Sequence, residues 1–207
     1  MYLSSWRLGG APSQLLALTG GTALAAVIGN ALDAADPQTR QAGVDSEISA
    51  LQGLGYDTVE LDLRKPGAAN RIADYGLIWV RGGNVFALRT SMALSGADRA
   101  IHELITSDSI VYAGYSAGCC VLAPSLRGLE MVDDPKVVSN PPWDGLGLLP
   151  YAFLPHYRSR HPESAAIELV ATAYQNDGTP FRPVRDGEVI VIDSRCAAGF
   201  PVPEVQL

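Results

Sequence analysis

Apolar runs alternate with polar, helix-periodic segments along most of this chain. Two runs, residues 14–20 and 23–29, are almost wholly apolar and end at glycine, which is typical of interior parallel strands covered on both faces. Residues 58–63 alternate apolar and polar positions, as a strand nearer a sheet edge does. The remaining expected strands are 77–80, 109–113, 149–155 and 188–193, the last forming a tight hairpin with the turn at 183–187.

Helix signals separate these runs. Asp36 and Pro37 are a typical helix start and predict a helix that ends at Gly53 or Gly55. The other expected helices begin at residue 85, cover 97–106, begin at 117 and cover 162–174, while 64–76 and 124–149 are expected to be mostly loop. Strands that alternate with helices predict an α/β fold with a doubly wound, mainly parallel sheet and helices on both faces. With 207 residues, 47% of them hydrophobic, residues 1–207 are expected to form one domain.

Two glycine motifs fall where predicted strands end, which is the edge of a parallel sheet that binds ligands. Gly82-Gly83-Asn84 follows the strand 77–80, and Gly114-Tyr-Ser-Ala-Gly118 follows the strand 109–113. A serine between two glycines, after a strand and before a helix, is the pattern of a nucleophile elbow. Ser116 is therefore a candidate nucleophile, and a plain tight turn is the alternative.

A serine nucleophile needs a base, and the base needs an orienting acid. Among the three histidines, His102 lies within a predicted helix and His161 at a helix start, whereas His156 follows an apolar strand on the sheet edge that carries Ser116. His156 is therefore the candidate base. The residues alone do not decide which carboxylate is the orienting acid. Asp186 would give the chain order Ser-His-Asp. Four other carboxylates would give the order Ser-Asp-His of α/β-hydrolases: Glu130, Asp133, Asp134 and Asp144.

Charge and cysteine content narrow the class of protein. A net charge of -7 and a pI near 4.9 argue against nucleic acid and anionic membrane surfaces as partners. Cys119, Cys120 and Cys196 have neither a disulfide framework nor a zinc spacing, which favours the cytoplasm and a structural role for the adjacent pair. We expect no metal and no cofactor, because the histidines stand apart from suitable carboxylates in the sequence. Assembly into a homo-oligomer is left open.

Three motifs in this order resemble the peptidase E (α-aspartyl dipeptidase) and cyanophycinase family of serine peptidases. They are Gly82-Gly-Asn-Val-Phe86, Gly114-Tyr-Ser-Ala-Gly118 and Leu154-Pro-His-Tyr157, and the resemblance runs from residue 15 to 193. It implies a fold related to class I glutamine amidotransferases, with Ser116 in place of their cysteine. It also implies His156 as base, with the acid at Asp186, where peptidase E has a glutamate; Glu130 is the nearest match to a second acid considered in the family.

The function expected from this resemblance is hydrolysis of small peptides with an N-terminal aspartate through an acyl-enzyme on Ser116. The N–H groups of Gly83 and Ala117 would form the oxyanion hole. Because a carboxylate out of water needs donors or a cation, Arg158 and Arg160 are the expected receivers of the substrate aspartate, followed by Arg81 and Asn84. The alternatives are an α/β-hydrolase-type esterase and a non-enzymatic, amidotransferase-like binding domain.

Overall fold

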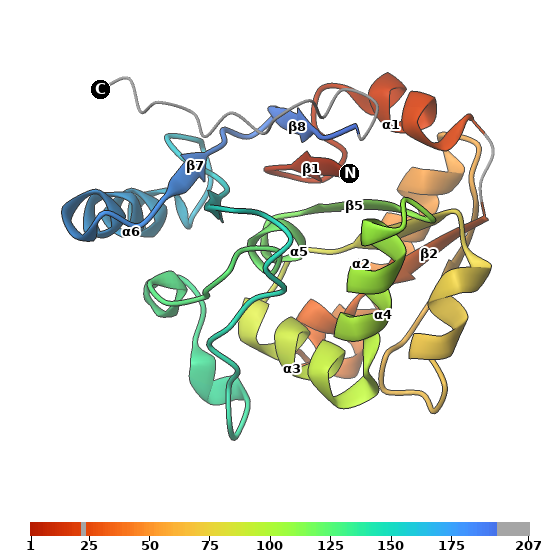
Figure 1. Ribbon diagram of the computed structural model, residues 1–207, viewed down its shortest axis with the longest axis horizontal. Helices are drawn as coiled ribbons and strands as arrows, with labels where there is room; N and C mark the ends of the chain where they lie inside the picture. The colour runs from red at the N-terminus through yellow and green to blue at the C-terminus, as the bar shows by residue number, and fades with distance from the viewer. Residues whose placement is uncertain (22–23, 194–207) are drawn as a thin grey trace.

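A six-stranded sheet forms the centre of the protein (Figure 1), whose computed structural model describes residues 1–21 and 24–193. The strand order is β3-β2-β4-β5-β1-β8, and every neighbouring pair is parallel except the antiparallel pair of β1 and β8. The strands are β1 (Tyr2–Ser4), β2 (Leu24–Ile28), β3 (Asp57–Glu60), β4 (Leu77–Val80), β5 (Val111–Tyr115) and β8 (Val189–Val191). The mainly parallel sheet predicted from the sequence is confirmed, with β3 at one edge.

Helices cover both faces of this sheet. The helices are α1 (Pro12–Thr19), α2 (Pro37–Gln52), α3 (Val85–Ser95) and α4 (Ala97–Thr106). Apolar residues of α1 and α2 pack with Trp79 and Tyr115, whereas those of α3 and α4 pack with Ile78 and Val80. Because successive side chains of a strand point to opposite faces, the two groups of residues form two separate cores, one on each side. The doubly wound arrangement is therefore confirmed.

A second, two-stranded parallel sheet lies beside the first. It consists of β6 (Ala152–Leu154) and β7 (Phe181–Pro183), which α6 (Ser164–Asp177) connects. The short helix α5 (Ala117–Cys120) follows β5, and single helical turns lie at η1 (Asn30–Leu32), η2 (Ala69–Asp74), η3 (Leu129–Met131) and η4 (Pro135–Val137). The two segments expected to be mostly loop contain only η2, η3 and η4.

Three sequence-based expectations about elements were wrong, and one strand was missed. Residues 14–20 belong to the helix α1, with a proline in its first turn and left-handed Gly20 at its end, since a short apolar run does not separate strand from buried helix. The buried strand β1 was not predicted at all. The expected hairpin at 183–193 does not form, because β7 pairs with β6 and β8 pairs with β1. The strand before His156 lies in the small sheet rather than on the central sheet's edge.

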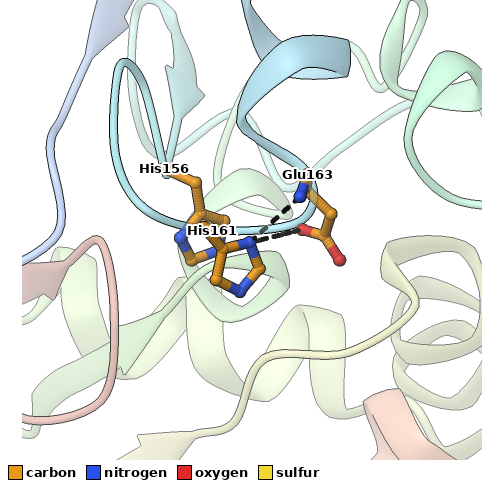
Figure 2. A group of neighbouring side chains, drawn as sticks. All are labelled: His156, His161 and Glu163. Carbon is orange, nitrogen blue, oxygen red and sulfur yellow. Dashed lines mark hydrogen bonds and ion pairs between the residues drawn. The ribbon is translucent and has the colours of Figure 1, made fainter.

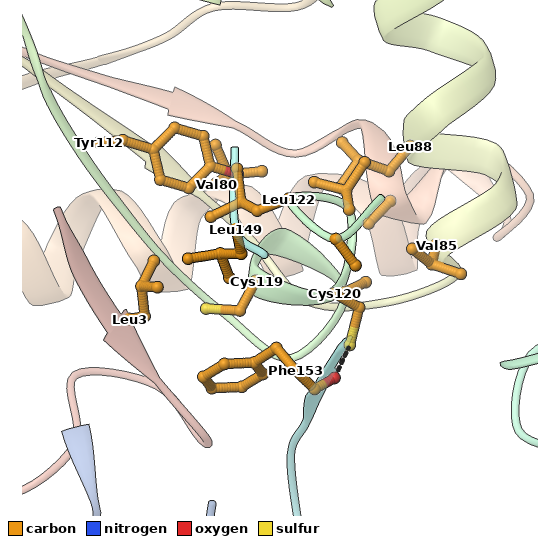
Figure 3. Packing of buried hydrophobic residues seen from close by; sticks show 14 of the residues in the cluster. Leu3, Val80, Val85, Leu88, Tyr112, Cys119, Cys120, Leu122, Leu149 and Phe153 are labelled. Carbon is orange, nitrogen blue, oxygen red and sulfur yellow. Dashed lines mark hydrogen bonds between the residues drawn. The ribbon is translucent and has the colours of Figure 1, made fainter. Parts of the chain in front are cut away.

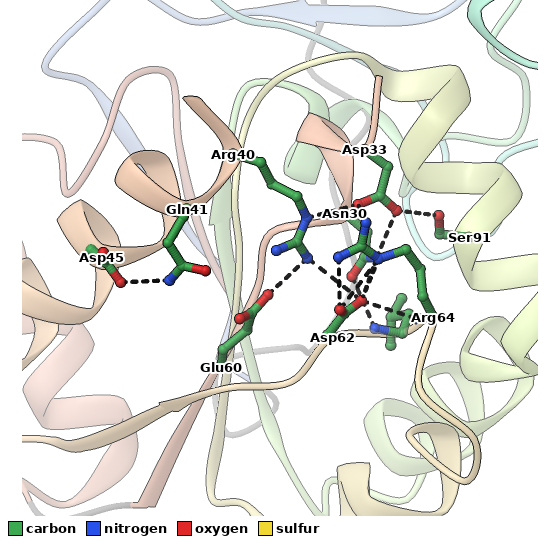
Figure 4. A network of polar contacts seen from close by, with 10 residues as sticks. Asn30, Asp33, Arg40, Gln41, Asp45, Glu60, Asp62, Arg64 and Ser91 are labelled. Carbon is green, nitrogen blue, oxygen red and sulfur yellow. Dashed lines mark hydrogen bonds and ion pairs between the residues drawn. The ribbon is translucent and has the colours of Figure 1, made fainter. Parts of the chain in front are cut away.

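A buried polar network lies where β2 and β3 end (Figure 4). Asn30, which is fully buried, donates to the carboxylates of Asp33 at 2.8 Å and Asp62 at 3.3 Å. Arg40 of α2 pairs with the same two carboxylates, at 3.0 and 3.5 Å. Removing one partner of a buried ion pair is strongly destabilising because it leaves an uncompensated charge, so these contacts hold the turn η1 in place. The carbonyl group of Ala31 in that turn borders the candidate site.

Candidate active site

Ser116 occupies the single residue between β5 and α5. Its φ of 50° and ψ of -121° lie in a region that non-glycine residues rarely adopt, at a cost of order 1–3 kcal/mol. A Cβ atom at Gly114 would lie 2.5 Å from the carbonyl oxygen of Val80, and one at Gly118 would lie 2.2 Å from the same oxygen. Glycine is therefore required on both sides of Ser116, because β4 passes too close for any side chain.

The Gly82-Gly83 loop lies directly against this turn. A Cβ atom at Gly82 would lie 2.9 Å from the Cβ of Ser116. Gly83 has a φ of 145°, and a Cβ there would lie 2.6 Å from the carbonyl oxygen of Ala31. Within the described residues the N–H of Gly83 donates to no backbone acceptor. Ala117 is the first residue of α5, where N–H groups lack a partner within the helix. Two backbone donors thus lie beside Ser116.

His156 and Asp186 form a hydrogen-bonded pair. Nδ1 of His156 lies 2.7 Å from Oδ1 of Asp186, and the imidazole is fully buried. Ser5 connects the two residues, because its hydroxyl donates to Oδ1 of Asp186 at 2.8 Å and accepts from the N–H of His156 at 2.8 Å. Glu130 instead accepts from the N–H of Gly128 and is not paired with His156. No local motif singles out Ser5, which lies just after β1.

The pKa of His156 is lowered below 6.5, chiefly because burial disfavours the imidazolium and further because His161 is adjacent, although Asp186 acts in the opposite direction. The neutral imidazole is therefore the resting form at neutral pH. Since Nδ1 faces a carboxylate, the proton sits on Nδ1 and the lone pair on Nε2.

No hydrogen bond joins the Ser116 hydroxyl to His156 in the described part of the chain, where Nε2 of His156 is buried without a hydrogen-bond partner. The indole ring of Trp6 lies between the two regions, with edge contacts to Tyr115 at 5.5 Å and to His156 at 5.7 Å between ring centres. Catalytic hydrogen bonds are often long in structures without substrate. The structure thus joins base and acid, and it leaves serine and base unpaired.

The expected receivers of the substrate carboxylate differ in their surroundings. Asn84 caps α3 through an oxygen that accepts from the N–H of Ala87 at 2.9 Å, and its amide donates to a backbone carbonyl at 3.0 Å. Arg81 pairs with Glu47 at 3.4 Å and donates to the adjacent carbonyl group. Both side chains are therefore engaged in holding the fold.

Arg158 and Arg160, in contrast, are exposed and border a cavity of about 730 Å³ next to Asp186. The cavity is lined by Trp6, Arg158, Ser159, Arg160, His161, Pro162, Arg185 and Asp186. Arg185 is a third cation at this cavity that was not predicted from the sequence. Only the carboxylate of the Asp186-Gly187 turn, next to it in the chain, was expected to act in the site. Three guanidinium groups around one cavity favour an anionic ligand.

The sequence also predicted structural rather than reactive roles for Cys119 and Cys120, and histidines separated from carboxylates. Cys119 and Cys120 are buried among apolar side chains (Figure 3), and burial raises the pKa of both thiols well above its usual value, so neither is a thiolate. Cys196 lies outside the described residues. The expected separation of histidines from carboxylates does not hold, because Glu163 approaches both His156 and His161 (Figure 2).

Comparisons with known proteins extend these observations. The model of peptidase family S51 matches residues 9–198. An uncharacterized peptidase from Listeria innocua is 29% identical over 153 residues, covering 72% of both chains. A Drosophila melanogaster protein named "Probable alpha-aspartyl dipeptidase" is 28% identical over 72% of this chain and 62% of its own length.

Solved structures agree with the sequence relatives. The crystal structure of a candidate peptidase E from Listeria monocytogenes EGD-e superposes with a TM-score of 0.77 at 27% identity, covering 92% of each chain. None of the helices in the described part of the chain combines the length and apolarity needed to cross a membrane.

Proposed function

Because the chain belongs to peptidase family S51, whose members are serine peptidases, we propose that it hydrolyses small peptides that begin with aspartate. The resemblance to peptidase E predicted from three motifs is confirmed by the family match and the relatives. The observation that carries the proposal is the pair formed by Asp186 and the buried His156, whose Nε2 makes no hydrogen bond within the described residues and carries the lone pair of a base. The reaction is expected to need no cofactor and to take place in the cytoplasm.

In the proposed reaction, Nε2 of His156 takes the proton of the Ser116 hydroxyl as the oxygen attacks the backbone carbonyl carbon of the N-terminal aspartyl residue. The N–H groups of Gly83 and Ala117 donate to the oxyanion that forms. His156 then gives the proton to the leaving amine, and an acyl-enzyme remains on Ser116. Water, activated by His156, releases the aspartate, while Asp186 stabilises the imidazolium in both steps. Substrate binding must bring the serine and the imidazole into contact.

Preference for aspartate follows from the charge around the cavity. Arg158, Arg160 and Arg185 offer bidentate donors to a carboxylate, and their side chains line the same hollow as Asp186. Of the three guanidinium groups, that of Arg158 forms an ion pair with Glu168 at 3.9 Å and is therefore less available to a ligand. We propose that Arg160 and Arg185 carry most of the selectivity. Replacing either with methionine should raise KM for an Asp-X dipeptide more than it lowers kcat.

Hydrolysis of Asp-X dipeptides, compared with Glu-X and Ala-X, tests the proposal. Wild type should prefer Asp-X, and Ser116→Ala should abolish turnover while the protein stays folded. Ser107→Ala, an exposed hydroxyl at the end of α4, is the matched control and should match wild type. If Ser116→Ala hydrolysed Asp-X as fast as wild type, Ser116 could not be the nucleophile. If wild type hydrolysed Ala-X as fast as Asp-X, the proposed specificity for aspartate would be refuted.

A further inference from the structure

Three atoms of the kind that bind metals lie together beside the His156–Asp186 pair. Oε2 of Glu163 lies 3.8 Å from Nε2 of His156 and 3.9 Å from Nδ1 of His161 (Figure 2). All three atoms lie within 4.8 Å of one another. In a triangle of these dimensions, the point equidistant from the corners is about 2.1–2.5 Å from each, close to the ~2.0–2.2 Å of zinc–nitrogen and zinc–oxygen bonds. An inward shift of a few tenths of an ångström would suffice.

None of these three atoms offers a proton to the others. His156 holds its ring proton on Nδ1 toward Asp186, so Nε2 presents a lone pair. His161 accepts from the backbone N–H of Glu163 at 3.3 Å, so its Nδ1 also carries a lone pair, which a metal would take over from this long hydrogen bond. The carboxylate of Glu163 is an acceptor only. Three acceptors therefore face one another, and Nε2 of His156 is fully buried without a hydrogen bond.

Leaving a buried polar atom unpaired is costly, and a cation between the three acceptors would satisfy all of them at once. Two imidazoles and one carboxylate, with a fourth position open to water, are a ligand set that zinc adopts in proteins. Metal-binding histidines usually donate their other ring N–H to a carboxylate, as His156 does to Asp186.

The surroundings of His161 allow the adjustment that coordination requires. Its ring stacks on that of His156, with centres 3.6 Å apart and planes 9° apart, so the two lone pairs run side by side rather than converging. His161 lies before α6 and is partly exposed, which leaves room for its ring to turn toward the ion.

We propose that His156, His161 and Glu163 form a binding site for a divalent transition metal of the zinc type, and that its occupation inhibits the peptidase. The metal takes the lone pair that His156 needs to accept the Ser116 proton. Inhibition rests on the function proposed above, whereas binding of the metal does not.

Titration of the full chain carrying Ser116→Ala with Co²⁺, followed by displacement with Zn²⁺, tests binding without any catalytic readout. We expect each chain to bind one Co²⁺ in tetrahedral coordination, seen by its visible absorption, and we expect this absorption to disappear when Zn²⁺ displaces the Co²⁺. His161→Ala and Glu163→Gln should each weaken binding at least tenfold, whereas two controls of the same types, exposed His102→Ala and half-buried Glu168→Gln, should leave it unchanged. Absence of saturable binding, or binding that none of the ligand variants weakens, would overturn the site.

Inhibition is measured separately in wild type and in His161→Ala, each compared with its own metal-free rate. Zn²⁺ should inhibit wild-type hydrolysis of Asp-X, a chelator should restore it, and His161→Ala should need at least tenfold more Zn²⁺. Metal binding in a protein without peptidase activity would refute the proposed function and keep the site. Peptidase activity that saturating Zn²⁺ leaves unchanged would refute the inhibitory role.

Discussion

Replacement of Asp186 with asparagine removes the negative charge of the carboxylate while keeping a side chain of nearly the same size and shape. In the structure both Nδ1 of His156 and the hydroxyl of Ser5 converge on the same oxygen, Oδ1, at 2.7 and 2.8 Å. An asparagine oxygen can accept from both donors, so Asp186→Asn should fold. What the variant loses is the negative charge that stabilises His156 as it becomes protonated in the transition state.

The size of this effect follows from the geometry. With charge centres about 4 Å apart and an effective dielectric constant near 20, the attraction is about 4 kcal/mol. Since 1.36 kcal/mol corresponds to a tenfold change in rate, kcat for an Asp-X dipeptide should fall about a thousandfold. If the amide turns its NH₂ group toward His156, the ring proton moves to Nε2 and the loss is larger.

The assay is steady-state hydrolysis of Asp-X, with thermal unfolding measured on the same samples. Asp134→Asn is the matched control, because Asp134 caps η4 through Lys136 and is one of the acids that the alternative Ser-Asp-His order would use. Its kcat should stay within twofold of wild type. The reasoning fails if Asp186→Asn keeps a tenth or more of the wild-type kcat, or if Asp134→Asn falls as far.

Three further outcomes follow from the protonation states of buried groups. Because burial lowers the pKa of His156 and the base must be neutral, kcat/KM should rise with pH with a midpoint below 6.5; a midpoint above 6.5 in the pH–rate profile would contradict this. Burial raises the pKa of Asp133 to about 7, so the folded protein holds this proton more tightly than the unfolded chain does, and stability should fall as pH rises from about 4 through about 7. Asp133→Asn, which can still accept from the N–H of Val85, should reduce the loss of stability measured by denaturant unfolding between pH 5 and pH 8, by at most about 3 kcal/mol; an unchanged loss would show that another group is responsible. Because burial keeps Cys119 and Cys120 as thiols, iodoacetamide should leave the rate of the folded enzyme unchanged; rapid inactivation with a label on either residue would revive a thiol mechanism.

The central strands and first long helix could be predicted because their signals are local. Asp36 caps α2 through the N–H groups of Gln38 and Thr39, as its position before Pro37 indicated. The motif around Ser116 identified its strand-to-helix turn for the same reason. The error at 14–20 arose because a short apolar run fits both a strand and a buried helix, and the helix packs its buried Leu15 into the core beneath the sheet.

The missed residues make contacts that no local pattern encodes. Ser5 reaches His156 and Asp186 only because the chain's first strand inserts between β5 and β8. Arg185 borders the arginine-lined cavity because β7 pairs with β6 rather than turning back on β8. Glu163 approaches His156 because the segment between β6 and α6 bends sharply, with positive φ at His156 and Arg158. Pairing between distant short strands decided these positions, and its stability depends on the whole core rather than on the turn residues.

Covalent labelling with an activated phosphonate tests most directly whether Ser116 is the nucleophile that His156 and Asp186 activate. Intact mass should show one adduct per chain, peptide mapping should locate it on Ser116, and His156→Ala should slow its formation at least a hundredfold. A folded protein that forms no adduct, or that forms it on another residue at the same rate with and without His156, would contradict the account.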